Sequence, residues 1–145
     1  MYEKEKEQFA EMISIIAKLR GSEGCPWDRK QTLESLAPNI IEEAKEVSDA
    51  VEAKDMDNLC EELGDLLMVI LMKIEIAKEK GLFVYSDVLN GAIEKFTRRH
   101  PHVFGDIKVN NSEEALAVWK QMKKKEKEKN INKVKFRTKK INLRD

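Results

Sequence analysis

Apolar residues recur every three or four positions along most of this chain, which is the spacing of one face of an α-helix. Five stretches show this spacing: residues 3–19, 38–53, 58–80, 86–99 and 112–123. No strand-like alternation of comparable length accompanies them. The sequence therefore predicts an all-α protein, a helical bundle of four to five helices per chain.

Helix breakers and capping residues mark where these helices begin and end. Pro38 suits the first position of a helix, Asp57 suits the N-cap of the next one, and Gly81 suits the position just after its end. Two segments rich in breakers, 21–27 and 100–106, are predicted as loops.

The third predicted helix is apolar on nearly all sides between residues 66 and 72. A helix of this kind is buried on several faces. One chain of four or five helices offers too little surface to cover it, so we expect a homodimer whose subunits complete the core together.

Acidic residues interrupt the apolar face of two neighbouring helices in the same way. Segments 40–51 and 59–74 repeat one pattern at an offset of 19 residues, and at about 100° per residue Glu43 falls within the apolar face and Glu46 on its edge. The four matching carboxylates are Glu43, Glu46, Glu62 and Asp65. A carboxylate on a core-facing stripe is costly unless it is paired, so these four point to a shared cation, Mg²⁺ or Mn²⁺.

Two other interpretations of the acidic residues stand beside this one. A solvated acidic surface explains Glu42, Asp49 and Glu61, which fall on the outer face, but not the inward carboxylates. A di-iron bundle would need Glu-x-x-His motifs, whereas the histidines, His100 and His102, lie in a predicted loop.

Charge is divided unevenly along a chain whose net charge is zero. Residues 1–119 carry 15 basic and 24 acidic side chains, and from Lys120 onward there are 12 basic and 3 acidic ones. We expect one domain over 1–129 and a basic tail over 130–145, which is weakly suited to contact nucleic acid. Two unpatterned cysteines, a charged N-terminus and short apolar runs indicate a cytoplasmic protein without a membrane span.

Several motifs, taken together and in order, resemble the MazG family of all-α nucleoside triphosphate pyrophosphohydrolases. They are Gly-Cys-Pro-Trp-Asp at 24–28, Gln-Thr at 31–32, Glu-Ser-Leu at 34–36, Glu-Glu-Ala-Lys-Glu-Val at 42–47, Glu-Glu-Leu-Gly-Asp-Leu-Leu at 61–67, Arg-Arg-His-Pro-His-Val-Phe-Gly-Asp at 98–106, and Trp119 with Lys123. Leu33 departs from this pattern, because the family often has a histidine there.

The resemblance implies Mg²⁺-dependent hydrolysis of a nucleoside triphosphate to the monophosphate and pyrophosphate. Non-canonical and deoxy forms are candidate substrates, and removal of unwanted nucleotides is the expected purpose. It implies a homodimer, and it makes Glu43, Glu46, Glu62 and Asp65 the metal ligands, with Mn²⁺ as a substitute. It also matches a second set to the nucleotide: Lys95 and Arg99 to the phosphates, and Trp119 and Lys123 to the nucleotide site.

Some roles stay open at this point. Trp119 suits either a stacked base or a helix anchor in the core, and Trp27 suits either a functional loop or the closed end of the bundle. Glu42 adjoins the metal ligands and is a candidate helper in catalysis, although its helical angle favours solvent.

Rival functions come from two classes. A dUTP or dCTP pyrophosphatase or a phosphoribosyl-ATP pyrophosphohydrolase would share the helices, but the 25–28 and 100–104 stretches favour MazG. A catalytically silent adapter would bind a partner or nucleic acid through the basic tail, but it would have no need of four inward carboxylates.

Overall fold

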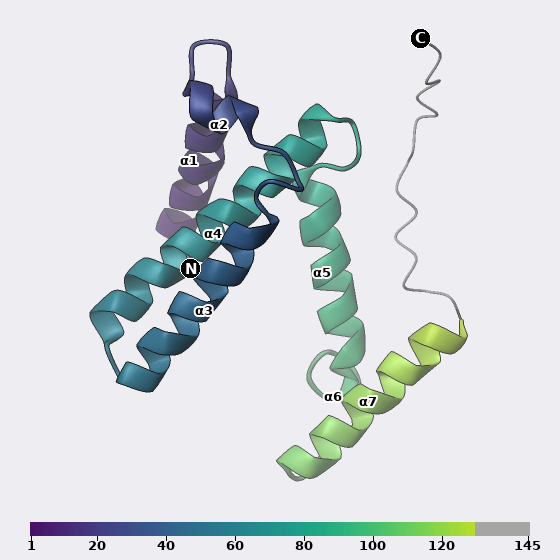
Figure 1. Ribbon diagram of the computed structural model, residues 1–145. Coiled ribbons are helices and arrows are strands. Elements are labelled where there is room, and N and C mark those ends of the chain that lie inside the picture. Colours follow the sequence, from purple (N-terminus) through teal and green to yellow (C-terminus); the bar gives the residue numbers. More distant parts are fainter. Residues whose placement is uncertain (130–145) are drawn as a thin grey trace. The chain divides into compact units, whose positions relative to one another are not determined.

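The structure is a computed structural model that describes residues 1–129, and the predicted basic tail lies outside the described residues. The described part contains helices and no strands, which confirms the all-α prediction. The helices are α1 (Glu3–Arg20), α2 (Pro26–Lys30), α3 (Ala37–Ala53), α4 (Met56–Glu79), α5 (Tyr85–Arg99), α6 (Pro101–Phe104) and α7 (Ser112–Glu128) (Figure 1).

The five long helices follow the predicted ones, and the differences lie in short segments. The short helix α6 lies within the predicted loop 100–106, and the short helix α2 begins at the end of the predicted loop 21–27; each has a proline at its start. Proline suits this place because it lacks an N–H that would have no helical partner there. The predicted cap Asp57 was wrong: the Asp55 side chain accepts from the Asn58 N–H at 3.0 Å, so α4 begins two residues earlier than expected.

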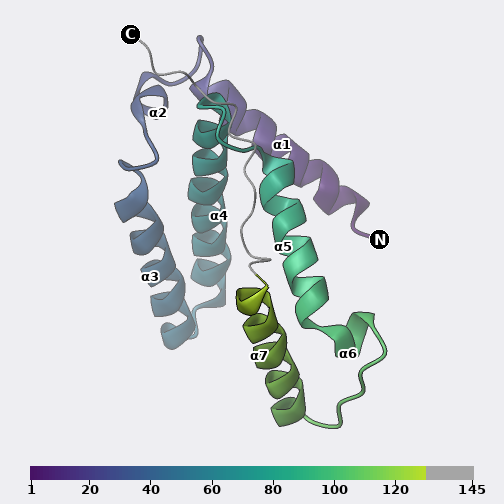
Figure 2. The same ribbon diagram turned by 90° about the vertical axis from the view of Figure 1, so that its right-hand side faces the viewer.

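The described chain divides into two compact units, of which the first is Met1–Leu82. In this unit α4 packs against both α3 and α1, and α3 and α4 form an antiparallel hairpin (Figures 1 and 2). Its buried apolar residues come mostly from the C-terminal half of α4, with single contributions elsewhere: Ile16, Leu36, Ala50, Leu71, Met72, Ile74, Ile76 and Ala77. The acidic residues lie outside this core, on α3 and on the N-terminal half of α4, and their side chains are half-buried or exposed.

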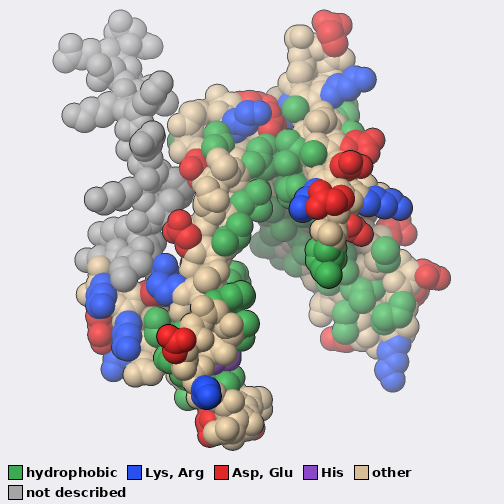
Figure 3. All heavy atoms as spheres, turned by 180° about the vertical axis from the view of Figure 1, so that it is seen from behind, with side chains coloured by type: hydrophobic (Ala, Val, Ile, Leu, Met, Phe, Trp, Pro, Cys, Tyr) green, Lys and Arg blue, Asp and Glu red, His purple; other side chains and the backbone are tan. Residues whose placement is uncertain are grey.

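The second unit begins at Phe83 and consists, in its described part, of α5, α6 and α7. Its buried side chains are charged, Arg99 and Glu126, while its large apolar side chains are half-buried or exposed. Ile93 and Phe96 on α5 are 62% and 57% exposed. Figure 3 shows apolar side chains lying open on the surface among the charged ones.

None of the helices in the described residues combines the length and apolar character that a membrane span requires.

Candidate active site

The α3–α4 hairpin is built by a short connection that turns the chain back on itself. Lys54 adopts a left-handed conformation with φ 55°, and its N–H closes α3 by bonding to the carbonyls of Ala50 and Val51. The Asp55 N–H then bonds to the Ala50 carbonyl at 3.1 Å, and the Asp55 side chain caps α4. The equal spacing of the acidic residues on either side of this turn therefore places them at matching heights on two facing helices.

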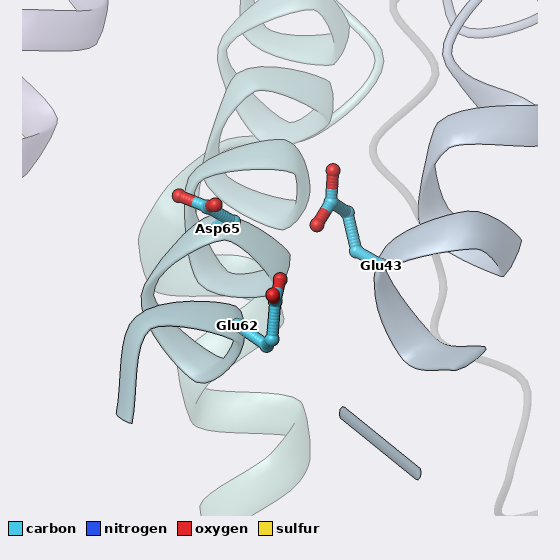
Figure 4. A group of neighbouring side chains, drawn as sticks. All are labelled: Glu43, Glu62 and Asp65. Atoms are coloured by element: carbon cyan, nitrogen blue, oxygen red, sulfur yellow. The ribbon is translucent and has the colours of Figure 1, made fainter. Parts of the chain in front are cut away.

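Three of the four predicted metal ligands converge between these helices. Figure 4 shows Glu43 on α3 next to Glu62 and Asp65 on α4. One carboxylate oxygen of each lies within 4.8 Å of the others. Like charges at this separation repel one another, so the arrangement favours a cation among them.

Glu46, the fourth predicted ligand, lies outside this group of three but touches it. Besides burial, the neighbouring Glu46 side chain raises the pKa of Glu62, and its charge raises the pKa of Glu43 as well. Glu46 is exposed, which agrees with its predicted place at the edge of the apolar face. Glu42 is also exposed, on the solvent side that its helical angle predicted.

Glu43 and Glu62 lie where burial and neighbouring negative charges disfavour an ionised carboxylate. Burial raises the pKa of Glu43 above its usual range, and the neighbouring charges of Glu46, Asp65 and Glu42 raise it further. Burial also raises the pKa of Glu62, together with the hydrogen bond and charge of Glu46 and the charges of Asp65 and Glu43. The Oε2 atom of Glu43 is buried and has no hydrogen-bond partner.

This arrangement fits a bound divalent cation. A buried carboxylate oxygen without a partner is costly, and a cation among Glu43, Glu62 and Asp65 would satisfy it. Carboxylate oxygens on two helices also match the hard ligands that Mg²⁺ and Mn²⁺ prefer. The site can therefore hold a metal ion, with Glu46 as the nearest further carboxylate.

A cavity of about 210 Å³ lies beside the carboxylates in the same unit. Trp27, Gln31, Asn39 and Met68 are among the residues that line it. Asn39 precedes Glu43 by four residues on α3, and Met68 follows Asp65 by three on α4, so two residues of the cavity wall lie about one helical turn, about 5 Å of helix rise, from carboxylate-bearing positions. Trp27 is 62% exposed, so of the two alternatives for this residue, the packed closure of the bundle end does not describe this structure.

Asn39 and Gln31 were not predicted as site residues. Asn39 is a polar side chain one helical turn before Glu43, and because residues four apart share a helix face, as do the carboxylates three apart, the same helical rule could have found it. Gln31 could be found only once the short helix α2 and the turn after it were known, because its place depends on that turn.

The remaining predicted residues lie in the second unit. Lys95 is exposed on α5, and Arg99 is 8% exposed, with Nε and Nη2 donating to Glu126 Oε2 at 3.0 and 2.8 Å. The Arg99 guanidinium and the Lys123 ammonium each lie 5.2 Å from the centre of the Trp119 ring, at cation–π distance. Lys95 is thus the more accessible of the two predicted phosphate ligands.

Trp119 also lines a second cavity, of about 350 Å³, with His100 and His102. The ring is only half-buried, so Trp119 is accessible from one side while cations cover part of it. This placement is compatible with a contact to a ligand as well as with a structural role.

Comparison with known proteins identifies the family. The family described as "MazG nucleotide pyrophosphohydrolase domain" matches residues 31–104, which include the whole acidic cluster. The chain is 52% identical over 98 residues to the nucleoside triphosphate pyrophosphohydrolase/pyrophosphatase MazG of Thermotoga maritima, covering 68% of this chain and 38% of that protein. It is 43% identical over 120 residues to the nucleoside triphosphate pyrophosphohydrolase of Escherichia coli, covering 82% of this chain and 46% of that one.

A further relative is the uncharacterized protein YabN of Bacillus subtilis, which is 47% identical over 120 residues, 83% of this chain and 24% of that protein. The chain thus spans less than half the length of these three relatives. Among solved structures, the mazG-related protein from Thermotoga maritima matches with a TM-score of 0.66 and 33% identity, over 81% of this chain and 98% of that one. From this agreement of sequence and fold, the chain belongs to the MazG nucleotide pyrophosphohydrolase family.

Proposed function

We propose that this protein hydrolyses nucleoside triphosphates to the monophosphate and pyrophosphate, with Mg²⁺ held by Glu43, Glu62 and Asp65. The observation that carries the proposal is the convergence of three carboxylates within 4.8 Å around a buried oxygen that has no partner. Two of the relatives carry nucleoside triphosphate pyrophosphohydrolase in their names, which supports the reaction class.

The carboxylates fit this chemistry because an acidic cluster alone repels a triphosphate. Bound Mg²⁺ neutralises phosphate charge and lowers the pKa of a coordinated water, and Mn²⁺ would serve in its place. Glu43, Glu62 and Asp65 would hold the ion, and Glu46 would add a fourth carboxylate next to Glu62. In this hydrolysis the oxygen of the attacking water bonds to the α-phosphorus while the bond between the α-phosphorus and the oxygen that bridges to the β-phosphorus breaks. Pyrophosphate therefore leaves with the bridging oxygen.

The cavity beside the cluster suits the nucleoside end of the substrate. Its volume of about 210 Å³ is below the roughly 300–1,000 Å³ of sites that enclose a whole drug-sized ligand. A nucleotide whose α-phosphate lies at the carboxylates would reach this cavity with its sugar and base. Trp27 offers an aromatic face there, and Gln31 and Asn39 offer amides that can hydrogen-bond to a base.

We also propose the homodimer that the sequence predicts. The second unit has no buried apolar side chain among its described residues, although α5 carries Val88, Leu89, Ile93 and Phe96. Exposed apolar side chains in such number are typical of a surface that another chain covers. Sedimentation over a range of concentrations should give a dimer, and a monomer throughout would contradict the proposal.

The proposed function also includes the predicted nucleotide-binding roles of four residues in the second unit: Lys95, Arg99, Trp119 and Lys123.

Product analysis tests the reaction. A panel of nucleoside triphosphates is incubated with Mg²⁺ or with a chelator, for wild type and for a Glu43→Ala, Glu62→Ala double variant. We expect monophosphate and pyrophosphate only with metal and only from wild type. The matched control Glu61→Gln removes an exposed carboxylate beside Glu62 and should keep full activity.

Other products would overturn parts of the proposal. Release of diphosphate and orthophosphate would mean that water attacks a different phosphorus. Absence of turnover from a folded wild-type protein with every substrate would reject the enzyme and favour the adapter.

A further inference from the structure

One buried arginine joins three segments of the first unit. Arg20 is the last residue of α1, and its side chain is 7% exposed. Its Nε and Nη2 donate to Oε1 and Oε2 of Glu79, each at 2.6 Å, so Arg20 and Glu79 form a bidentate ion pair. Because Glu79 is the last residue of α4, this pair joins the ends of α1 and α4.

The third donor group of the same guanidinium reaches the backbone of the α2 segment. Arg20 Nη1 donates to the carbonyl oxygen of Asp28 at 2.6 Å and to that of Gln31 at 3.2 Å. Glu79 fixes the plane of the guanidinium, and the guanidinium fixes two carbonyls in and just after α2.

The segment held in this way is short and mostly exposed, and other hydrogen bonds hold its start. Arg29 Nη1 donates to the Ser22 carbonyl at 2.6 Å, and the Cys25 N–H donates to the Leu19 carbonyl at 2.8 Å. Helix α2 has five residues, none of them buried, and a helix of this length is unstable by itself. Polar contacts continue the connection: Gln31 Nε2 donates to the Trp27 carbonyl at 3.1 Å, and Ser35 Oγ donates to Gln31 Oε1 at 2.8 Å.

The same segment forms a wall of the cavity beside the carboxylates, since Trp27, Asp28 and Gln31 all line it. From these contacts we propose that Arg20 and Glu79 are positioning residues, which set the wall formed by the α2 segment and thereby the affinity for the nucleoside part of the substrate. This inference rests on the proposed function, because it concerns the substrate of that reaction. The side-chain hydrogen bonds of Arg20 go to Glu79 and to the α2 segment, not to the predicted metal ligands.

A purely structural ion pair and a positioning pair make different kinetic predictions. If the pair sets the cavity wall, Glu79→Gln should raise KM for the nucleoside triphosphate about 10-fold, which is the size of effect expected from losing one hydrogen bond to a charged group. It should leave kcat within about twofold. The inhibition constant of inorganic tripolyphosphate, which has no base or sugar, should stay unchanged. A merely structural loss would weaken both ligands or lower kcat.

Hydrogen exchange supplies a readout that does not depend on turnover. Amides of residues 25–35 should exchange faster in Glu79→Gln than in wild type, while those of α3 and the carboxylate-bearing half of α4 should not change. Asp49→Asn, which removes the exposed ion pair with Lys45 on α3, is the matched control and should change neither kinetics nor exchange at 25–35. Ser35→Ala is a milder second variant, should Glu79→Gln fail to fold, and it should raise KM in the same direction by a smaller factor.

The outcomes separate this inference from the proposed function. If wild type turns over but neither variant changes KM, or KM and the tripolyphosphate constant rise together, the positioning role is wrong and the proposed function stands. If wild type does not turn over, the proposed function fails, and unchanged exchange at 25–35 would then overturn the positioning role as well.

Discussion

Two inward glutamates, one in each unit, have opposite surroundings: arginines surround Glu126, whereas other carboxylates surround Glu43. Glu126 on α7 is 1% exposed, and it accepts hydrogen bonds from Arg98 Nε at 2.8 Å and from Arg99 Nε and Nη2 at 3.0 and 2.8 Å. Glu43 on α3 lies among other carboxylates instead, and its buried Oε2 has no partner.

The difference separates a structural acid from one suited to bind a ligand. Folding alone favours pairing a buried charge with its opposite, as Arg98 and Arg99 do for Glu126. A cluster that lacks such partners lowers the stability of the metal-free protein and is explained by what it binds. Unequal pairing therefore distinguishes the two roles when burial alone would not.

Removing the paired glutamate should have the largest effect on stability. Glu126→Ala leaves the buried guanidinium of Arg99 and the half-buried one of Arg98 without their shared partner. Loss of one partner from a buried pair costs about 3–5 kcal/mol. Denaturant unfolding measures this loss. Glu128→Ala, an exposed change on the same helix, should cost far less, and equal costs would break the comparison.

Removing an unpaired carboxylate should instead affect catalysis. Glu62→Gln keeps the shape of the side chain but removes a metal ligand, so kcat/KM at saturating Mg²⁺ should fall at least about 100-fold. Steady-state kinetics of Glu62→Gln, compared with those of the control variant Glu61→Gln, measures this loss. A variant that keeps wild-type activity would mean that Glu62 does not hold the metal.

Glu79 is a second glutamate that is paired with an arginine, Arg20, and the contribution of this pair to stability should depend on pH. The hydrogen bonds from Arg20 lower the pKa of Glu79, so the pair stabilises the folded state above the ordinary glutamate pKa of about 4.3, and this contribution is lost as the pH falls through the lower folded value. Because the Glu79 side chain is 40% exposed, Glu79→Gln should lose only about 0.5–1 kcal/mol at neutral pH. Unfolding measured from neutral pH into acid should show this difference closing, and a difference that grows in acid would refute the assignment.

The smallest expected effect concerns the cations around Trp119. Lys123→Met removes one of two cations at 5.2 Å from the ring, which is worth about 0.5–1 kcal/mol at an exposed site. The free energy of unfolding, compared with that of Lys124→Met, measures it. Equal values for the two variants would show that the contact of Lys123 with Trp119 adds nothing to stability.

Sequence reasoning predicted the long helices and the acidic cluster well because both depend on local periodicity. The i to i+3 spacing puts Glu62 and Asp65 on one face whatever surrounds them, and the short turn after α3 brings Glu43 opposite. The cap of α4 was misplaced by two residues because Asp55 and Asp57 are equally good caps by type, and only the observed bond to the Asn58 N–H distinguishes them.

Contacts between distant segments were beyond such reasoning. Arg20 and Glu79 are 59 residues apart, and the buried Arg99–Glu126 pair spans 27. Periodicity places Arg99 on one face of α5, but it cannot say that an acid on α7 takes two of its donors. The motif that suggested Arg99 as a phosphate ligand therefore could not reveal that its guanidinium is already bonded to Glu126.

Thermal unfolding of wild type and Glu43→Gln, each with a chelator and with excess Mg²⁺ or Mn²⁺, tests the central claim most directly. With the chelator, Glu43→Gln should melt at the higher temperature because it removes charge that burial and neighbouring carboxylates disfavour. With metal, the order should reverse, because only wild type gains the free energy of binding. Glu61→Gln should follow wild type in both conditions. If Glu43→Gln is the less stable protein in the chelator, or if metal stabilises both proteins equally, the carboxylate cluster is not a metal site.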